Sequence, residues 1–208
     1  MEILILTVLR LLAPLLILRW PILGIISSMY LDFQDFNYFN IQNDNDMKNY
    51  QAWDKILDTY YLALAFYTSL SWKETLAKKL SIFFFSYRAI GIAVFLALQS
   101  RLLLLAFPNL FEHFFLFYLL FKKFTNNAKL FTSLPISIII IASIAIPKLF
   151  AEYYLHILHS PPLLNLDRTV ITPLFPASQE GIVLYTLYIC PAVAILIARI
   201  LYARRAGS

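Results

Sequence analysis

The chain has 208 residues, of which 61% are hydrophobic and 14% are charged, and its formal net charge is +5. Soluble domains are about 45–50% apolar and about 25% charged, so this composition indicates an integral membrane protein, and the longest apolar windows have no polar face of the kind a soluble helix needs. The single cysteine, Cys190, excludes an intramolecular disulfide and a cysteine cluster for zinc or iron–sulfur. No basic and aromatic stretch points to nucleic acid as a partner.

Apolar segments long enough for a bilayer core, which takes roughly 20 residues, recur along the chain. They predict an all-α fold, a polytopic transmembrane bundle of about six spans that forms a single domain over residues 1–208. The first span is longer than a bilayer core, so it must tilt, kink near Pro14 or Pro21, or begin in the interface. The spans are expected at 3–31, 53–70, 80–98, 104–121, 134–158 and 180–203.

The loops between these spans alternate in charge. The segment 32–52 holds an acidic concentration, whereas the loops after the second and fourth spans and the C-terminal segment are basic. Because Lys and Arg accumulate in cytoplasmic loops, we expect a multi-pass protein of the cell membrane with both termini in the cytoplasm and 32–52 outside. Membrane lipids are then its partners, and a membrane protein or a second copy could join them. The basic residues are Lys73, Lys78, Lys79, Lys122, Lys123, Lys129, Arg199, Arg204 and Arg205.

Ionisable residues inside membrane spans are costly, so each one is a functional hypothesis. Asp54 and Asp58 open the second span and lie four residues apart, hence on one helix face. We expect these two carboxylates to share an outward polar pocket with Asp32 or Asp35 from the end of the first span. Asp58 lies beyond the reach of the helix dipole, so it needs a cation, a metal or a raised pKa. The candidate cations within the chain are Arg101 and Lys148.

The fifth span carries a second polar stripe. Lys148, Glu152 and His156 recur at every fourth residue and should face protein or a water-filled cavity. A hard divalent cation prefers carboxylate oxygens, while zinc or iron would also take imidazole, and Glu152 and His156 could reach one ion. The alternative is an ordinary helical ion pair between Lys148 and Glu152. The predicted cofactor is a divalent cation, with Asp32, Asp35, Asp54, Asp58 and Glu152 as metal ligands and Asp58 and His156 as catalytic residues.

Other polar residues at membrane depth have structural interpretations as well. Arg88 could reach the cytoplasmic interface, a partner carboxylate or a lipid phosphate. Glu112 and His113 lie early in the fourth span. Arg10 and Arg19 are nine residues apart, on opposite faces of a straight helix, so contact with the interface or with phospholipid is expected for both.

The aspartates Asp32, Asp35, Asp54 and Asp58 form the pattern D-x2-D-x18-D-x3-D. This resembles the metal-binding signature of the CDP-alcohol phosphatidyltransferase superfamily over about 27 residues, where two aspartates end one helix and two begin the next. The resemblance implies two divalent ions that bind a CDP diphosphate, Asp58 as the base for the attacking alcohol, and the other three aspartates as metal ligands. It also implies a further helix before the first aspartate pair and a site that faces the cytoplasm.

Three hypotheses for the function remain open from the sequence. The favoured one is a membrane-embedded enzyme with an outward-facing carboxylate and histidine site that acts on a lipid-like substrate. The second is a non-catalytic membrane subunit or interaction protein, in which the polar groups are structural. The third is a small ion or proton transporter that uses Asp54, Asp58, Glu152 and His156, although no inverted repeat is visible.

Overall fold

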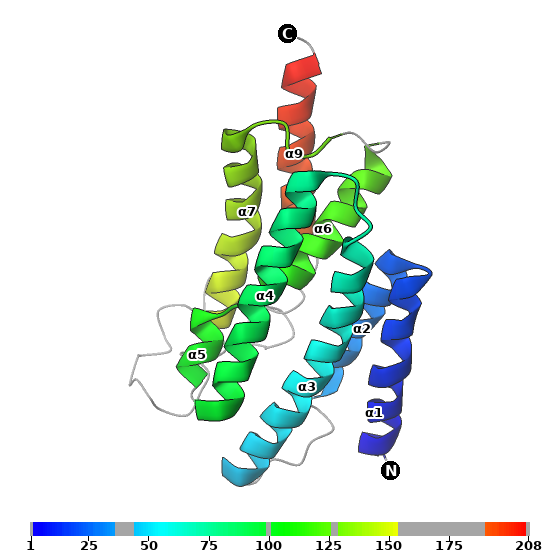
Figure 1. The fold of residues 1–208 in the computed structure, drawn as a ribbon, viewed down its shortest axis with the longest axis vertical. Coiled ribbons are helices and arrows are strands. Elements are labelled where there is room, and N and C mark those ends of the chain that lie inside the picture. The colour runs from blue at the N-terminus through cyan, green and yellow to red at the C-terminus, as the bar shows by residue number, and fades with distance from the viewer. Residues whose placement is uncertain (1, 36–43, 99–100, 126–128, 154–189, 207–208) are drawn as a thin grey trace, which may run out of the picture. The chain divides into compact units, whose positions relative to one another are not determined.

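The structure is a computed structural model that describes residues 2–35, 44–98, 101–125, 129–153 and 190–206. The elements over these residues are helices, which confirms the predicted all-α class (Figure 1). The chain divides into two compact units, residues 1–99 and 100–208, and each is described below by itself. The expectation of one domain over the whole chain stays a prediction.

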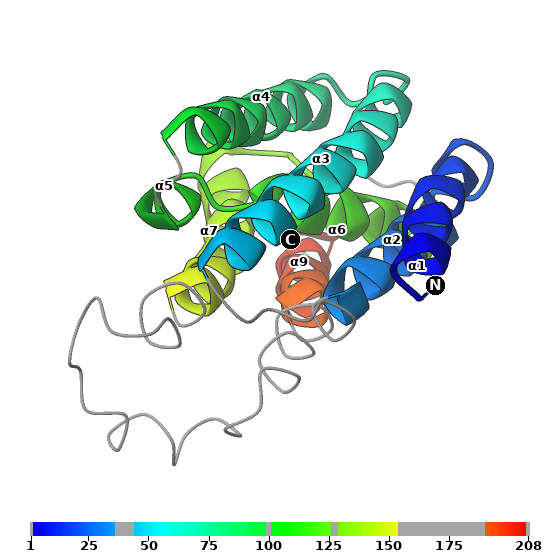
Figure 2. The same ribbon diagram turned by 90° about the horizontal axis from the view of Figure 1, so that it is seen from below.

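The N-terminal segment is a helical hairpin. Helix α1 (Glu2–Leu12) continues into a 3-10 helix, η1 (Ala13–Leu18), and the chain then reverses into α2 (Pro21–Asp35). Helices α1 and α2 lie side by side (Figures 1 and 2). The expectation of one continuous helix over 3–31 is therefore wrong.

Two prolines and a glycine account for the reversal. Pro14 lies in the first turn of η1, where its missing N–H interrupts the α-helical pattern, and Pro21 begins α2, where that N–H is not needed. The backbone of Ile17 packs directly against Gly24: a Cβ atom on Gly24 would lie 2.2 Å from the Ile17 nitrogen. The close approach of the two arms thus depends on a residue without a side chain.

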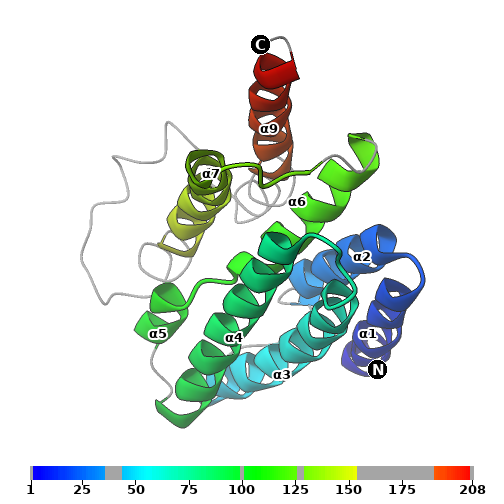
Figure 3. The ribbon, with the colours of Figure 1, turned by 45° about the horizontal axis from the view of Figure 1, so that its top comes forward.

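Helices α3 (Asp44–Ser69) and α4 (Thr75–Leu98) form a second antiparallel pair, side by side in Figures 1 and 3. The Phe66 and Phe85 rings stack across the pair at 4.3 Å. Helix α3 begins before the predicted span at residue 53, so Asp54 and Asp58 lie more than two turns inside it, not at its start. The preceding polar residues form the first turns of α3 because acidic side chains there complement the helix dipole.

The second unit is built on a phenylalanine-rich helix. Phe111, Phe114, Phe115 and Phe117 of α6 are fully buried, and α6 packs against α7 and α9. The predicted span 104–121 is broken around Pro108, which cannot continue a helix from the preceding residue. Residues 154–158 and 180–189, expected in the last two spans, lie outside the described residues. The helices of this unit are α5 (Arg101–Ala106), α6 (Leu110–Phe124), α7 (Leu134–Tyr153) and α9 (Cys190–Ala206).

Helix length bears on the expected membrane spans. Within the described residues, α4 is the one helix long and apolar enough to cross a bilayer by itself. Shorter apolar stretches occupy Ile3–Leu18, Pro21–Asp32, Leu134–Phe150 and Cys190–Tyr202. Length and composition alone would also suit a core helix of a soluble protein, so the six spans remain a prediction.

Candidate functional site

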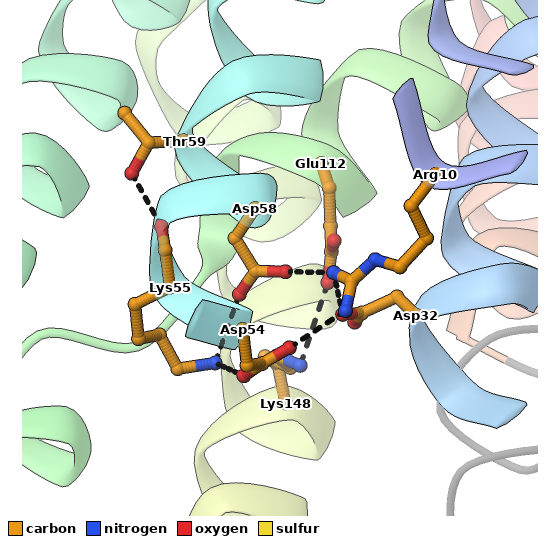
Figure 4. Close-up of polar contacts among 8 residues, drawn as sticks. All are labelled: Arg10, Asp32, Asp54, Lys55, Asp58, Thr59, Glu112 and Lys148. Carbon is orange, nitrogen blue, oxygen red and sulfur yellow. Dashed lines mark hydrogen bonds and ion pairs between the residues drawn. The ribbon is translucent and has the colours of Figure 1, made fainter. Parts of the chain in front are cut away.

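A buried arginine joins three aspartates in the first unit (Figure 4). The guanidinium of Arg10, from α1, donates through Nη1 to Asp54 Oδ1 at 3.0 Å and through Nη2 to Asp58 Oδ1 at 2.9 Å. Nη2 also donates to Asp32 Oδ1, from α2, at 2.5 Å. The fork of an arginine suits this arrangement because its N–H groups point at several carboxylates at once. One side chain thus connects three helices.

Lys55 completes the group from the other side. Its Nζ lies 2.5 Å from Asp54 Oδ2 and 2.8 Å from Asp58 Oδ2, the second oxygens of these two carboxylates. We call Arg10, Asp32, Asp54, Lys55 and Asp58 the charged cluster. Three carboxylates and two cations leave it a net charge of −1 when all five are ionised. Buried charges are tolerated only when paired in this way.

The three aspartates of the charged cluster also have the spacing of a metal site. One carboxylate oxygen from each of Asp32, Asp54 and Asp58 lies within 4.8 Å of the others. Asp54 and Asp58 are buried, while the side chain of Asp32 keeps 30% of its surface exposed. Access to the carboxylates is therefore widest at Asp32, near the end of α2.

Aromatic residues flank the charged cluster. The Trp53 ring lies 5.1 Å from Cζ of Arg10, a cation–π contact that helps to hold the guanidinium in place. Tyr50 lies in α3 before the predicted span that starts at residue 53. Burial, and then the charges of the three aspartates, raise the pKa of the Tyr50 phenol above its usual value. Tyr50 is therefore a neutral hydroxyl beside the carboxylates.

The structure brings together three of the five predicted metal ligands. Asp32, Asp54 and Asp58 converge as expected. Asp35 ends α2 and Glu152 lies in α7, but their side chains are outside the part of the chain that the structure describes, and so is His156. Metal binding, and the catalytic roles of Asp58 and His156, stay predictions.

Sequence reasoning missed both cations of the charged cluster. Asp58 is paired with Arg10 and Lys55, whereas the sequence suggested Arg101 or Lys148 as its cation. The side chain of Arg101 lies outside the described residues, so that part of the expectation stays a prediction. Arg10 was expected at the interface or on phospholipid, yet it is 3% exposed and bonded to protein. A local signal existed for Lys55, which lies next to Asp54 and three residues before Asp58. No local signal linked Arg10 to residues more than twenty positions away.

Arg88 was expected to reach the interface, a carboxylate or a lipid phosphate. Its side chain is buried in α4, with 4% of the residue exposed. The buried position places Arg88 within the protein and not on the outer surface of α4.

The second unit holds a separate polar group. Lys148 Nζ of α7 lies 3.5 Å from Glu112 Oε1 of α6, and His113 Nδ1 lies 3.3 Å from the same oxygen (the first pair is drawn in Figure 4). Glu112 and His113 are buried. The Lys148 side chain, 14% exposed, faces protein as expected of the fifth-span stripe.

Comparison of the chain with protein-family models, with curated proteins and with solved structures finds no match.

Proposed function

We propose that the protein crosses a membrane several times. Large apolar side chains on its described helices are exposed, among them Leu4 at 68%, Tyr67 at 69% and Leu134 at 73%. Only 33% of the apolar window of α4 is buried. Soluble monomers rarely leave so much apolar surface in contact with water, whereas a lipid bilayer is its natural surrounding.

The N-terminal hairpin favours a different position for the N-terminus than a single helix does. Because α1 and α2 are antiparallel, the beginning of α1 and the end of α2 lie at the same end of the first unit, at the bottom in Figure 1. The turn between α3 and α4, with Lys73, lies at the opposite end. The positive-inside rule assigns that basic turn to the cytoplasm. We therefore place the N-terminus outside, together with the end of α2.

Cysteine labelling from outside tests this topology. In a Cys190→Ser background, which removes the one native cysteine, Glu2→Cys and Asn43→Cys should both react with an impermeant maleimide. Lys73→Cys should be protected until the membrane is permeabilised. Protection of Glu2→Cys with labelling of Asn43→Cys would support a cytoplasmic N-terminus. Labelling of Lys73→Cys alone would mean that the charged cluster lies on the cytoplasmic side, and it would favour the CDP-alcohol resemblance.

Within this membrane protein, the three aspartates bind a divalent cation and form the site of an enzyme that acts on a lipid-like substrate. The observation that carries this proposal is the approach of three carboxylate oxygens from two helices to within 4.8 Å. Hard cations such as Mg²⁺ and Mn²⁺ prefer oxygen ligands of this kind. The exposed side of Asp32 leaves a route for an amphipathic substrate from the membrane surface.

The order of the helices also supports the proposed metal-dependent enzyme. The resemblance to CDP-alcohol phosphatidyltransferases implies a helix before the one that ends in the first aspartate pair, and α1 with η1 supplies it. Asp32 and Asp35 close α2, and Asp54 and Asp58 lie on the next helix, α3. Asp58, the most buried of the three aspartates, would take the role of base in that chemistry, which also requires the charged cluster to face the cytoplasm and so the reverse of the topology proposed above.

Manganese binding provides the test. The full chain in lipid nanodiscs should bind Mn²⁺, measured by electron paramagnetic resonance, and Asp58→Asn should weaken binding by about tenfold or more, because a ligand is lost. Asp46→Asn, on the same helix but outside the charged cluster, is the matched control and should bind as the wild type does. Equal Mn²⁺ affinity in Asp58→Asn would exclude the aspartates as the metal site.

A second candidate function has its own observation. Each of the three carboxylates is already paired with Arg10 or Lys55, as a purely structural ion cluster in a non-catalytic membrane subunit would be. In that case the wild type binds no Mn²⁺, and Asp58→Asn lowers only the stability. The same titration, run with a thermal melt of each variant, separates the two candidates.

A further inference from the structure

Arg10 binds the same three carboxylates that a cation would need. Its two terminal nitrogens bind one oxygen from each of Asp32, Asp54 and Asp58. These bonds are 2.5–3.0 Å long and the guanidinium is buried, so Arg10 lies among the carboxylates and not beside them. A divalent ion bound to the same three oxygens would meet a positive charge at contact distance, where repulsion is strong away from water.

Lys55 differs from Arg10 in the carboxylate oxygens that it contacts. It binds the second oxygens of Asp54 and Asp58 and lies on the same helix as these two partners. A cation among the first oxygens can leave these contacts in place. Arg10, in contrast, comes from α1, so its departure changes how the N-terminal hairpin is held against α3.

We propose that Arg10 is a built-in competitor of the cation: its guanidinium occupies the three-aspartate site until a divalent ion displaces it. The inference rests on the proposed metal-binding function and adds its regulation. Only the fraction of molecules with Arg10 withdrawn can bind the ion, so Arg10 weakens the apparent affinity in proportion to that fraction. Cation binding in turn loosens the contact between α1 and α3.

Three substitutions distinguish two effects on Mn²⁺ affinity: occupation of the carboxylates by the Arg10 side chain, and the net charge of the cluster. Arg10→Gln removes the competitor and changes the net charge of the cluster from −1 to −2, and Lys55→Met makes the same change of charge without freeing the first oxygens. Arg10→Lys keeps the buried positive charge that the fold requires, but an ammonium lacks the planar fork that reaches all three carboxylates. Mn²⁺ affinity is measured on the full chain in nanodiscs for each variant and for the wild type.

We expect Arg10→Gln to bind Mn²⁺ about tenfold more tightly than the wild type. Arg10→Lys should fall between the two, and Lys55→Met should gain less than Arg10→Gln. Equal gains for Arg10→Gln and Lys55→Met, with no gain for Arg10→Lys, would show an effect of charge alone and overturn the inference. Weaker or unchanged binding in both Arg10 variants would overturn it as well, while leaving the metal site intact. If neither the wild type nor any variant binds Mn²⁺, the metal site itself is wrong, and the inference falls with it.

Discussion

Replacing Arg10 by glutamine should lower the free energy of unfolding of the first unit by about 3–5 kcal/mol in the absence of metal, because removing one partner of a buried ion pair leaves uncompensated charge behind. Arg10 contacts three carboxylates from two helices, and its side chain is only 2% exposed. Glutamine is shorter and uncharged, so it can satisfy at most part of this network. The loss should therefore lie in the upper part of the range for single substitutions.

Tryptophan fluorescence gives a clean readout of this loss. The protein has three tryptophans, Trp20, Trp53 and Trp72, and all of them belong to the first unit. Unfolding in mixed micelles followed at these residues therefore reports on the unit that contains the charged cluster. Because Trp53 also contacts Arg10, the starting spectrum should change as well.

Arg19→Gln is the matched control for Arg10→Gln. It makes the same change of charge in the same hairpin, but Arg19 is exposed. Its effect should stay within about 0.5 kcal/mol, as for surface substitutions generally. Similar losses for Arg10→Gln and Arg19→Gln would mean that the contacts of Arg10 contribute little to stability.

Gly24→Ala should destabilise the first unit by about 3 kcal/mol or more, at the upper end of the cost of overpacking. The added Cβ would lie 2.2 Å from the nitrogen and 2.6 Å from the Cα of Ile17. These are backbone atoms, which cannot turn away as the end of a side chain can. The arms of the hairpin must separate, and Arg10 on one arm then moves away from Asp32 on the other.

Whether Gly24→Ala lowers or raises the stability shows whether the close contact between the two arms is formed. Gly→Ala inside an ordinary helix stabilises by roughly 0.5–1 kcal/mol, since alanine loses less backbone entropy. Ser27→Ala on the same helix is the control: the Ser27 hydroxyl donates to the Gly24 carbonyl within α2, so only a local bond is lost. A stabilised Gly24→Ala variant, measured by the same tryptophan fluorescence, would mean that the close contact between the arms is not formed.

The sequence by itself determined the all-α class and the grouping of the aspartates. Asp54 and Asp58 share a helix face through local geometry, and Asp32 ends the helix that precedes theirs along the chain. Such relations follow from spacing within one or two elements. The proline positions also indicated where the first segment would be interrupted, although not that it would reverse.

Only the tertiary structure decided which cation pairs with these aspartates. The contacts of Arg10 with Asp54 and Asp58 span 44 and 48 residues, and they exist because the hairpin folds back at a glycine that fits against Ile17. Under the expected single helix, Arg10 had no route to Asp32. The pairing of Lys148 with Glu112 joins α7 to α6 in the same long-range way. Local spacing fixes which side chains share a face, but the partner across that face depends on how closely two backbones can approach, and that is a property of the packed chain.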